Sequence, residues 1–290
     1  MTDHVLPSDV DRLGKLRGTA PSCPLITQRN DPMDVSPLAL RVATYNLKGG
    51  TSARDRTREL CDLASLAALA PHVIGLQECK WWNHDHRRHL GVAERMLNKR
   101  GILLESNSDG CHLALLVDPT VVEIVDLRHR THGFHHGVLC VQARVHGHPL
   151  DLAVVHLAPS SPLRRELEAE LFKLCVPIDH PIIAMGDWNA APSEEAGVKV
   201  PNGVDPAHAR RKLDTRAAKA LEEAGLIDVG AHLGDHSPTV GHTGDHELAY
   251  RCDRILSTLP TTTFTGHQVH DFGSSDHRPV EACFDLAKAR

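Results

Sequence analysis

The sequence predicts an α/β protein, a four-layer α/β/β/α sandwich in which two mixed, largely antiparallel β-sheets lie face to face with outer helices. Two observations lead to this expectation. Many short apolar runs of strand length follow one another between residues 41 and 286. A few longer segments with helical apolar spacing lie among them, a pattern that suits two packed sheets covered by helices.

The chain of 290 residues is expected to form one domain with an N-terminal extension. Residues 1–38 contain five prolines and few large apolar side chains, so they offer no periodic face for burial. No internal repeat or low-complexity block is evident further on. We therefore expect an extension over 1–38 and a folded domain over 39–290.

The strand-length runs alternate or are continuously apolar, as β-strands in packed sheets do. The first, RVATYNL, is followed by a predicted helix over 51–70, where leucines recur at helical spacing from Leu60 to Leu69 before Pro71. The predicted strands span residues 41–47, 72–77, 112–117, 121–127, 137–145, 149–157, 181–188, 251–257, 263–272 and 277–286.

The connections between these runs have their own signals. The His146-Gly147-His148 turn predicts a hairpin between the fifth and sixth runs. Two further helices are expected over 162–174 and 215–224. The polar stretch 194–214 is expected to be a surface loop beside a functional site.

Composition limits the class of protein. Hydrophobic residues make up 41% and charged residues 24%, ordinary values for a globular domain. A net charge of −5 argues against a surface that attracts nucleic acid everywhere, although a local basic groove remains compatible with it. The 22 histidines would add positive charge below about pH 6.5, so attraction to phosphates should depend on pH.

The eight cysteines are scattered without a CxxC pair, which predicts reduced thiols in the core rather than a zinc site or a disulfide framework. The first residues contain no apolar leader, and no run approaches the roughly 18 apolar residues of a membrane span. These features predict a cytoplasmic protein without a membrane span.

Polar side chains stand at the ends of several predicted strands, where a rigid sheet can direct them into one cleft. A carboxylate at one strand end is usually a turn cap, but a whole set in this order points to a shared site. The set consists of Asn46, Glu78, His156, Asp187, Asn189, Asp253, Asp276 and His277. Oxygen donors without cysteine favour Mg²⁺, with Mn²⁺ as an alternative, over zinc.

The order and local sequence of these segments resemble the endonuclease/exonuclease/phosphatase superfamily over about residues 40–286. The GDWN and SDHRPV segments are the most specific matches. The resemblance implies a metal-dependent phosphoester hydrolase whose catalytic domain covers 39–290. The matching segments are ATYNL, IGLQE, VVHLAP, MGDWNAAP, RCDRIL and SSDHRPV.

The resemblance also implies roles at the metal. Glu78 is the expected principal ligand, and Asn46 and Asp276 are expected to complete or orient the ligand shell. Hydrolysis of a phosphoester needs such a cation to neutralise phosphate oxygens, and it needs a water held in line with the bond that breaks.

The remaining residues are expected to act on water and phosphate. Asp187 would polarise the attacking water, and Asn189 would bind a phosphate oxygen. His277 would donate to the scissile phosphate while Asp253 orients its ring and favours the imidazolium. His156 would be a second phosphate-facing donor or proton carrier.

Some of these residues have simpler interpretations. Asp253 could pair with Arg251 or Arg254, and Asn189 could be a turn residue. Arg165 resembles a helix arginine that the family directs towards the site as a substrate-binding group, while the alternative is a surface ion pair with Glu166 or Glu168. The histidine clusters at 84–89 and 128–137 are expected to be solvated loops, and Trp188 is expected to support the GDWN turn.

The substrate is predicted less sharply than the chemistry. His156 stands where apurinic-site repair enzymes of the superfamily carry a tyrosine, and only part of the inositol 5-phosphatase text is present. A nuclease acting on DNA or RNA is favoured, and it would bind its polyanion through basic side chains. A phosphodiesterase or phosphatase for a lipid or small-molecule phosphate is the alternative, and an inactive binding module is a third. The expected basic side chains are Arg210, Arg211, Lys212 and Arg216.

Overall fold

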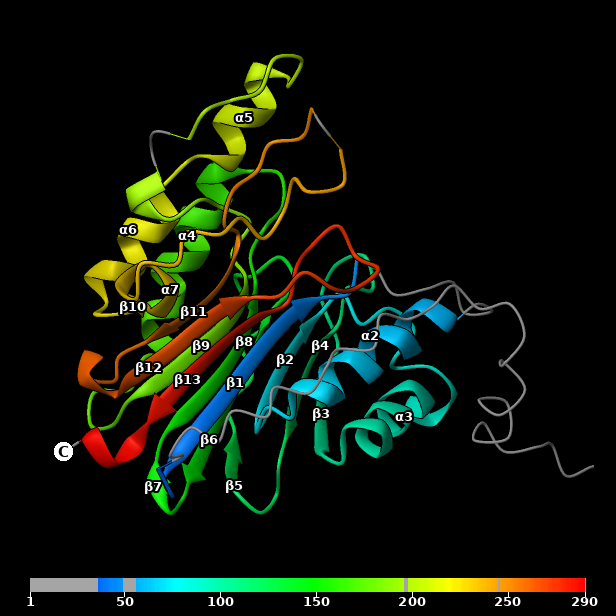
Figure 1. Cartoon of the computed structure of the whole chain (residues 1–290), viewed down its shortest axis with the longest axis vertical. Coiled ribbons are helices and arrows are strands. Elements are labelled where there is room, and N and C mark those ends of the chain that lie inside the picture. Colours follow the sequence, from blue (N-terminus) through cyan, green and yellow to red (C-terminus); the bar gives the residue numbers. More distant parts are fainter. Residues whose placement is uncertain (1–35, 49–55, 196–197, 245, 290) are drawn as a thin grey trace, which may run out of the picture. The chain divides into compact units, whose positions relative to one another are not determined.

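Two β-sheets of six and seven strands form the centre of the computed structural model, which describes residues 36–289 except 49–55, 196–197 and 245 (Figure 1). The first sheet has the order β12 (Phe264–Val269), β13 (Val280–Asp285), β1 (Ala39–Asn46), β2 (Val73–Gln77), β4 (Leu113–Val117), β3 (Arg100–Leu104). The second has the order β10 (Ile227–Asp228), β11 (Asp253–Ser257), β9 (Ile182–Asp187), β8 (Asp151–His156), β6 (Val138–Val145), β5 (Val122–Leu127), with β7 (His148–Pro149) paired to β6.

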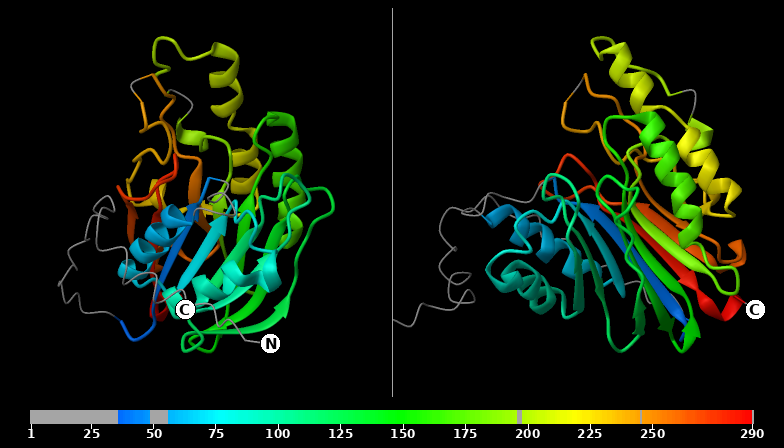
Figure 2. Two further views of the ribbon diagram at one scale, coloured as in Figure 1. Left: turned by 90° about the vertical axis from the view of Figure 1, so that its right-hand side faces the viewer. Right: turned by 180° about the vertical axis from the view of Figure 1, so that it is seen from behind.

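Helices cover the outer side of each sheet (Figure 2), so the predicted four-layer sandwich of mixed sheets is confirmed. The helices α2 (Thr57–Leu69) and α3 (Arg88–Leu97) pack on the first sheet, and α4 (Pro162–Phe172) and α6 (Arg216–Glu223) pack on the second. The short α7 (Val229–His232) lies beside β11 and β12. Single turns of 3₁₀ helix are Asp85–Arg87, Lys173–Cys175, Ser193–Glu195, Thr261–Thr263 and Leu286–Lys288.

The central strands are apolar on both faces, because one face of each sheet packs on the other sheet and the opposite face packs on helices. In β8, Leu152 and Val154 join the core between the sheets, whereas Ala153 and Val155 face the cluster under α4 and α6. Successive side chains of a strand point to opposite faces, which explains the continuous apolar text of this run.

Among the described strands, two pairs are parallel, β1 with β2 in the first sheet and β8 with β9 in the second. In each pair a helix lies between the two strands in the sequence, α2 in one and α4 in the other, as a parallel connection requires. The carboxyl ends of all four strands therefore lie at one edge of the sandwich, which is where the polar residues of the sequence accumulate.

Two sequence predictions need correction. The predicted surface loop over 194–214 contains a helix, α5 (Pro206–Lys212), which Asp205 caps by accepting from the amides of Ala207 and His208 at 3.0 and 3.2 Å. The helix α3 and the strand β3 were not predicted from the sequence. The predicted helix over 51–70 is present as α2 from Thr57, while 51–55 lie outside the described residues.

Other predictions concern residues that the structure describes only in part. Residues 1–35 of the expected N-terminal extension lie outside the described residues. Five cysteines of the described residues are buried thiols, in agreement with the expectation of thiols in the core: Cys79, Cys111, Cys140, Cys175 and Cys252. Among the described helices, none combines the length and the apolar character needed to cross a membrane.

Candidate active site

The strand ends place the candidate residues at a single edge. Asn46 ends β1, Glu78 follows β2, His156 ends β8 and Asp187 ends β9. Asp253 begins β11 and is the antiparallel partner of Asp187. The segment carrying Asp276 and His277 enters β13, the other neighbour of β1.

Asn46 connects the two sheets at the centre of this site. Its amide nitrogen lies 3.2 Å from Glu78 Oε1 and 3.0 Å from Asp187 Oδ2, and its amide oxygen accepts from the backbone of Lys48. Burial and the nearby Asp187 carboxylate raise the pKa of Glu78. One amide group thus lies between the two carboxylates and donates to both.

The turn after β9 positions Asp187 and Asn189. Gly186 has a φ of +148°, and a Cβ there would lie 2.0 Å from the carbonyl oxygen of Val155, so only glycine lets β9 approach β8 this closely. Asn189 has a φ of +52° and donates its backbone N–H to Asp187 Oδ1 at 2.8 Å. Trp188 is fully buried and donates to the carbonyl of Arg254, which supports its predicted structural role.

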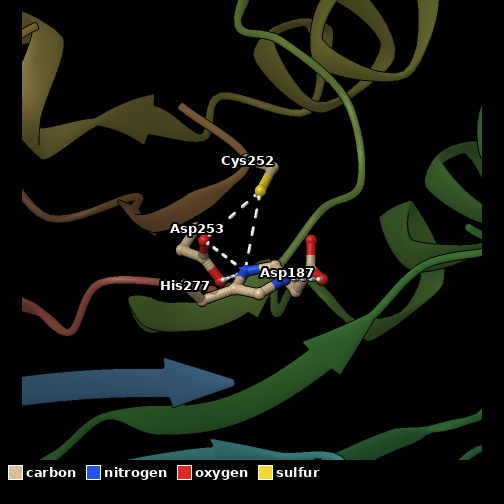
Figure 3. A group of neighbouring side chains, drawn as sticks. All are labelled: Asp187, Cys252, Asp253 and His277. Carbon is tan, nitrogen blue, oxygen red and sulfur yellow. Dashed lines mark hydrogen bonds and ion pairs between the residues drawn. The ribbon is translucent and has the colours of Figure 1, made fainter. Parts of the chain in front are cut away.

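His277 and Asp253 form a hydrogen-bonded ion pair (Figure 3), with Nδ1 2.8 Å from Asp253 Oδ2. Burial opposes the charge on His277, but the Asp253 carboxylate prevails and raises the pKa of His277 well above its usual value. The Cys252 thiol also donates to Asp253 at 3.3 Å. Arg251 pairs with Asp228 and Glu195 instead of Asp253, so the surface-pair interpretation of Asp253 is wrong.

The free nitrogen of His277 points into the site. Nε2 lies 3.9 Å from Asp187 Oδ2 and 4.0 Å from Asp276 Oδ1, too far for a hydrogen bond to either. Its N–H is therefore available to an oxygen atom entering between these carboxylates.

His156 has the opposite electrostatic character. Burial, the His277 cation and Lys212 lower the pKa of His156 to about 3, so its imidazole is neutral. Its Nε2 lies 3.5 Å from Asp187 Oδ2, and its ring stacks on His136 with centroids 4.1 Å apart. His156 is thus a neutral hydrogen-bonding group rather than a second cation.

Two predicted residues are engaged elsewhere. Asp276 pairs with Lys48, whose Nζ lies 2.8 Å from Oδ2. Burial raises the pKa of Asp276, but Lys48 and the nearby His277 together outweigh burial and lower it. Arg165 is fully buried and donates to the carbonyl oxygens of Ala158 and Arg211. Among the described residues it forms no ion pair with Glu166 or Glu168, so the expected surface pair is wrong. Its role as a substrate-binding group stays a prediction.

The carboxylates of Glu78 and Asp187 are donors of the kind that hard cations prefer, and a cation beside them would offset their repulsion. The Asn46 amide turns its nitrogen towards both carboxylates and its oxygen towards the Lys48 backbone, so it would have to rotate to become a ligand. Another group of potential ligands comprises Asp187, Cys252, Asp253 and His277, whose ligand atoms lie within 4.8 Å of one another. Burial raises the pKa of the Cys252 thiol to about 12, which opposes the thiolate form that a metal requires.

Sequence reasoning missed several neighbours of these groups. His136 stacks on His156, Thr239 holds the backbone amides of Cys252 and Asp253, and Lys212 donates to Asn189. None has a motif that would reveal it, because each reaches the site from a loop or helix distant in the sequence. Lys212 was predicted as a basic residue that binds a polyanion, but its contact with Asn189 was not predicted. The Asp-Pro cap that begins α5 is the signal that could have placed Lys212 on a helix.

Hydrolysis of a phosphoester requires a charged donor, a carboxylate and an amide close to a cation. The described side chains are of these kinds. The sequence independently matches the model of the Endonuclease/Exonuclease/phosphatase family over residues 43–277. The chain belongs to this family and is a phosphoester-hydrolysing enzyme. No curated protein matches its sequence significantly.

Solved structures with the same fold are distant in sequence. An AP endonuclease from Archaeoglobus fulgidus is 19% identical with a TM-score of 0.61, covering 85% of this chain and 99% of its own. A humanised D. rerio TDP2 is 19% identical with a TM-score of 0.60, covering 85% and 98%. A mannosyl-6-phosphatase from Bacteroides thetaiotaomicron is 17% identical with a TM-score of 0.58, covering 84% and 98%.

Proposed function

We propose that this enzyme is a Mg²⁺-dependent phosphodiesterase that cleaves DNA or RNA, with Mn²⁺ able to replace Mg²⁺. The observation that carries the proposal is the charged His277 facing Asp187 across a gap of 3.9 Å, next to the carboxylates joined by Asn46. Asn46 and Glu78 would hold the cation, with Asp276 released from Lys48 to join them. When bound, the cation neutralises the non-bridging oxygens of the phosphate.

The protein's own groups supply the rest of the reaction. Asp187 is held by the amides of Asn46 and Asn189 and is placed to accept a proton from the attacking water. His277 donates to a phosphate oxygen through Nε2, while Asp253 fixes the ring at Nδ1. The neutral His156 supplies a further hydrogen bond from beside Asp187.

Nucleic acid as substrate is supported by cations at the rim of the site. Arg210 and Arg211 on α5 have exposed side chains, and Arg211 lines the adjoining pocket. Arg216, also expected to bind the polyanion, pairs with Glu166 and Asp214 and is less available. Among the solved structures of this fold is a D. rerio TDP2 complexed with a single-strand DNA product.

A small-molecule phosphoester is the second candidate, favoured by one observation. A pocket of about 550 Å³ adjoins His277 and Asp276, and this volume is typical of small-ligand sites. A substrate with one compact group beside its phosphate would fit it.

The test is hydrolysis of a mixed panel with Mg²⁺, with Mn²⁺ and with EDTA. The panel contains supercoiled DNA, single-stranded DNA, RNA, sphingomyelin, inositol phosphates and a chromogenic phosphodiester. His277→Ala should lower kcat/KM on the true substrate by about 1,000-fold or more, whereas the exposed His132→Ala should not. Activity on small esters but on no polynucleotide would reject the nuclease, and activity that survives EDTA or His277→Ala would reject the mechanism.

A further inference from the structure

Lys212 occupies an unusual position for a lysine. It ends α5 with a partly buried side chain, and its Nζ lies 2.8 Å from Asn189 Oδ1 inside the site. Among the residues that the structure describes, no carboxylate forms an ion pair with it. An ammonium group has three donors, and the bond to Asn189 uses one of them. A partly buried cation with unused donors is a binding group for an anion.

The pocket beside Lys212 indicates where that anion would lie. Lys212 lines it together with Asn189, His277 and Arg211, so three positive side chains and one amide border the same space. The carboxylates of Asp205, Glu247 and Asp276 line other parts of the pocket. The amide nitrogen of Asn189 donates to the carbonyl of Leu157, which leaves its oxygen turned towards Lys212. The field of Lys212 also reaches the neighbouring His156, whose pKa it helps to lower.

The surrounding structure holds this end of α5 in place. The carbonyl of Lys212 accepts from the amide of Ala191, and the carbonyl of Arg211 accepts from the buried Arg165. Arg165 also donates to Ala158, close to the end of β8. These bonds connect α5 to the loops that follow both catalytic strands, so the position of Lys212 is fixed relative to Asp187 and His156.

We propose that Lys212 is a substrate-binding residue that contacts a phosphoryl oxygen of the phosphoester, opposite His277, and that α5 is therefore a substrate-recognition element. The proposal rests on the proposed phosphoester chemistry of this site. The wall formed by Val204, Val240, Leu248 and Tyr250 leaves room in the same pocket for one compact group next to that phosphoryl group. The alternative is that Lys212 only orients Asn189.

Three substitutions separate these roles. Lys212→Arg keeps the charge, Lys212→Gln keeps a donor for Asn189 without the charge, and Lys212→Met removes both. Lys219→Met, at an exposed position of α6, is the matched control. Each variant is assayed for kcat/KM on the best phosphoester substrate and for binding of inorganic phosphate, measured by calorimetry in the presence of Mg²⁺.

Loss of a charged hydrogen bond should lower kcat/KM by about 10- to 100-fold in both Lys212→Met and Lys212→Gln. Phosphate affinity should fall in parallel, and Lys212→Arg should recover most of both properties. Full recovery in Lys212→Gln would show that Lys212 only orients Asn189, and phosphate binding equal to wild type in Lys212→Met would overturn the proposal.

The phosphate measurement keeps this test separate from that of the proposed function. If the wild type hydrolyses no phosphodiester, the proposed function fails, yet loss of phosphate binding in Lys212→Met and Lys212→Gln still supports the role of Lys212. If the wild type hydrolyses its substrate and all variants equal it, the function stands and the role of Lys212 is rejected. Failure of the wild type to bind phosphate at all also rejects that role.

Discussion

Two histidines lie beside the Asp187 carboxylate, and one is charged while the other is neutral. His277 and His156 lie 3.9 and 3.5 Å from Asp187 Oδ2. The partner of His277 is the Asp253 carboxylate, which raises the His277 pKa, whereas burial and the His277 cation lower that of His156 to about 3. A single residue type thus supplies a charged donor and a neutral hydrogen-bonding group, and the environment of each ring decides which.

Backbone geometry sets the position of Asp187 as strictly as charge does. Gly186 precedes it at a φ of +148°, with the Val155 carbonyl 2.0 Å from where a Cβ would lie. Because that neighbour is backbone of a parallel strand, the clash can be relieved only by moving β9 away from β8. Such a shift would carry Asp187 with it.

Gly186→Ala should therefore destabilise the protein and reduce its activity. We expect a loss of about 2–4 kcal/mol in the free energy of unfolding, measured by urea denaturation, with a lower kcat at unchanged metal concentration. Gly147→Ala is the control, because Gly147 has a φ of +82° and no atom within 4 Å of the added Cβ. An equal loss of unfolding free energy in both variants would show that the positive φ, and not the close approach of β8, explains why glycine is needed at position 186.

At the scale of elements, α4 and α5 act through Arg165. This side chain joins the loop after β8 to the end of α5 by donating to Ala158 and Arg211. A buried guanidinium that lost these carbonyl partners would leave unsatisfied polar groups, so the connection is specific to arginine.

Arg165→Met should release α5 and so weaken phosphate binding without removing any group that contacts the phosphate. We expect unfolding to become easier by about 1–3 kcal/mol and kcat/KM to fall by about tenfold or more. Arg164→Met is the matched control, because Arg164 is adjacent on α4 and pairs with Glu168 at a half-exposed position. Normal kcat/KM in a destabilised Arg165→Met protein would mean that Arg165 only supports the fold.

At the scale of the whole molecule, the features that could be predicted from the sequence are those that local residue patterns determine. The strands, the sandwich and the strand-end residues followed from apolar periodicity, because both faces of β8 and β9 are buried. The Asp253–His277 pair followed from family resemblance and is present in the structure.

The contacts that no local pattern encodes were missed. The helix α5 was taken for a loop since its seven residues include three basic ones and little apolar periodicity. The pairing of Asp276 with Lys48 and the stacking of His136 on His156 join residues that lie far apart in the sequence. Arg165 carries a helix-surface sequence context but is fully buried. Such placements depend on how the layers pack, which single residues do not reveal.

The many histidines make the whole fold sensitive to mild acid. Several are buried in the neutral form. Burial, followed by the neighbouring His156 and His135, lowers the pKa of His136 to about 3. Burial and the His277 cation lower the pKa of His156 to about 3. In the unfolded chain these groups take up protons near pH 6.5, so below that pH the unfolded state binds more protons than the folded state. Stability must therefore fall as the pH falls from 6.5 towards 3.

Two other kinds of titrating group change the stability mainly outside this pH interval. His277 and His180 have raised pKa values in the folded protein. Their contribution to the free energy of unfolding is therefore complete below pH 6.5, and it is lost only as the pH rises through their pKa values in the folded protein. Carboxylates such as Glu281 have lowered pKa values, and their contribution declines only below about pH 4.5. Carboxyl groups with raised pKa values, such as Glu78 and Asp62, oppose the decline between pH 6.5 and 5. The contribution of one buried histidine is therefore obtained from the difference between the wild type and a variant that lacks it.

Urea denaturation between pH 7.5 and 5 should show a decline of about 1.4 kcal/mol per pH unit for each fully suppressed histidine. His136→Asn removes one titrating group, so its free energy of unfolding should change less steeply with pH, whatever its value at pH 7.5. The exposed His132→Asn should keep the wild-type slope. A stability that stays level from pH 6.5 to 5, or a slope unchanged in His136→Asn, would mean that these imidazoles take up protons within the folded protein.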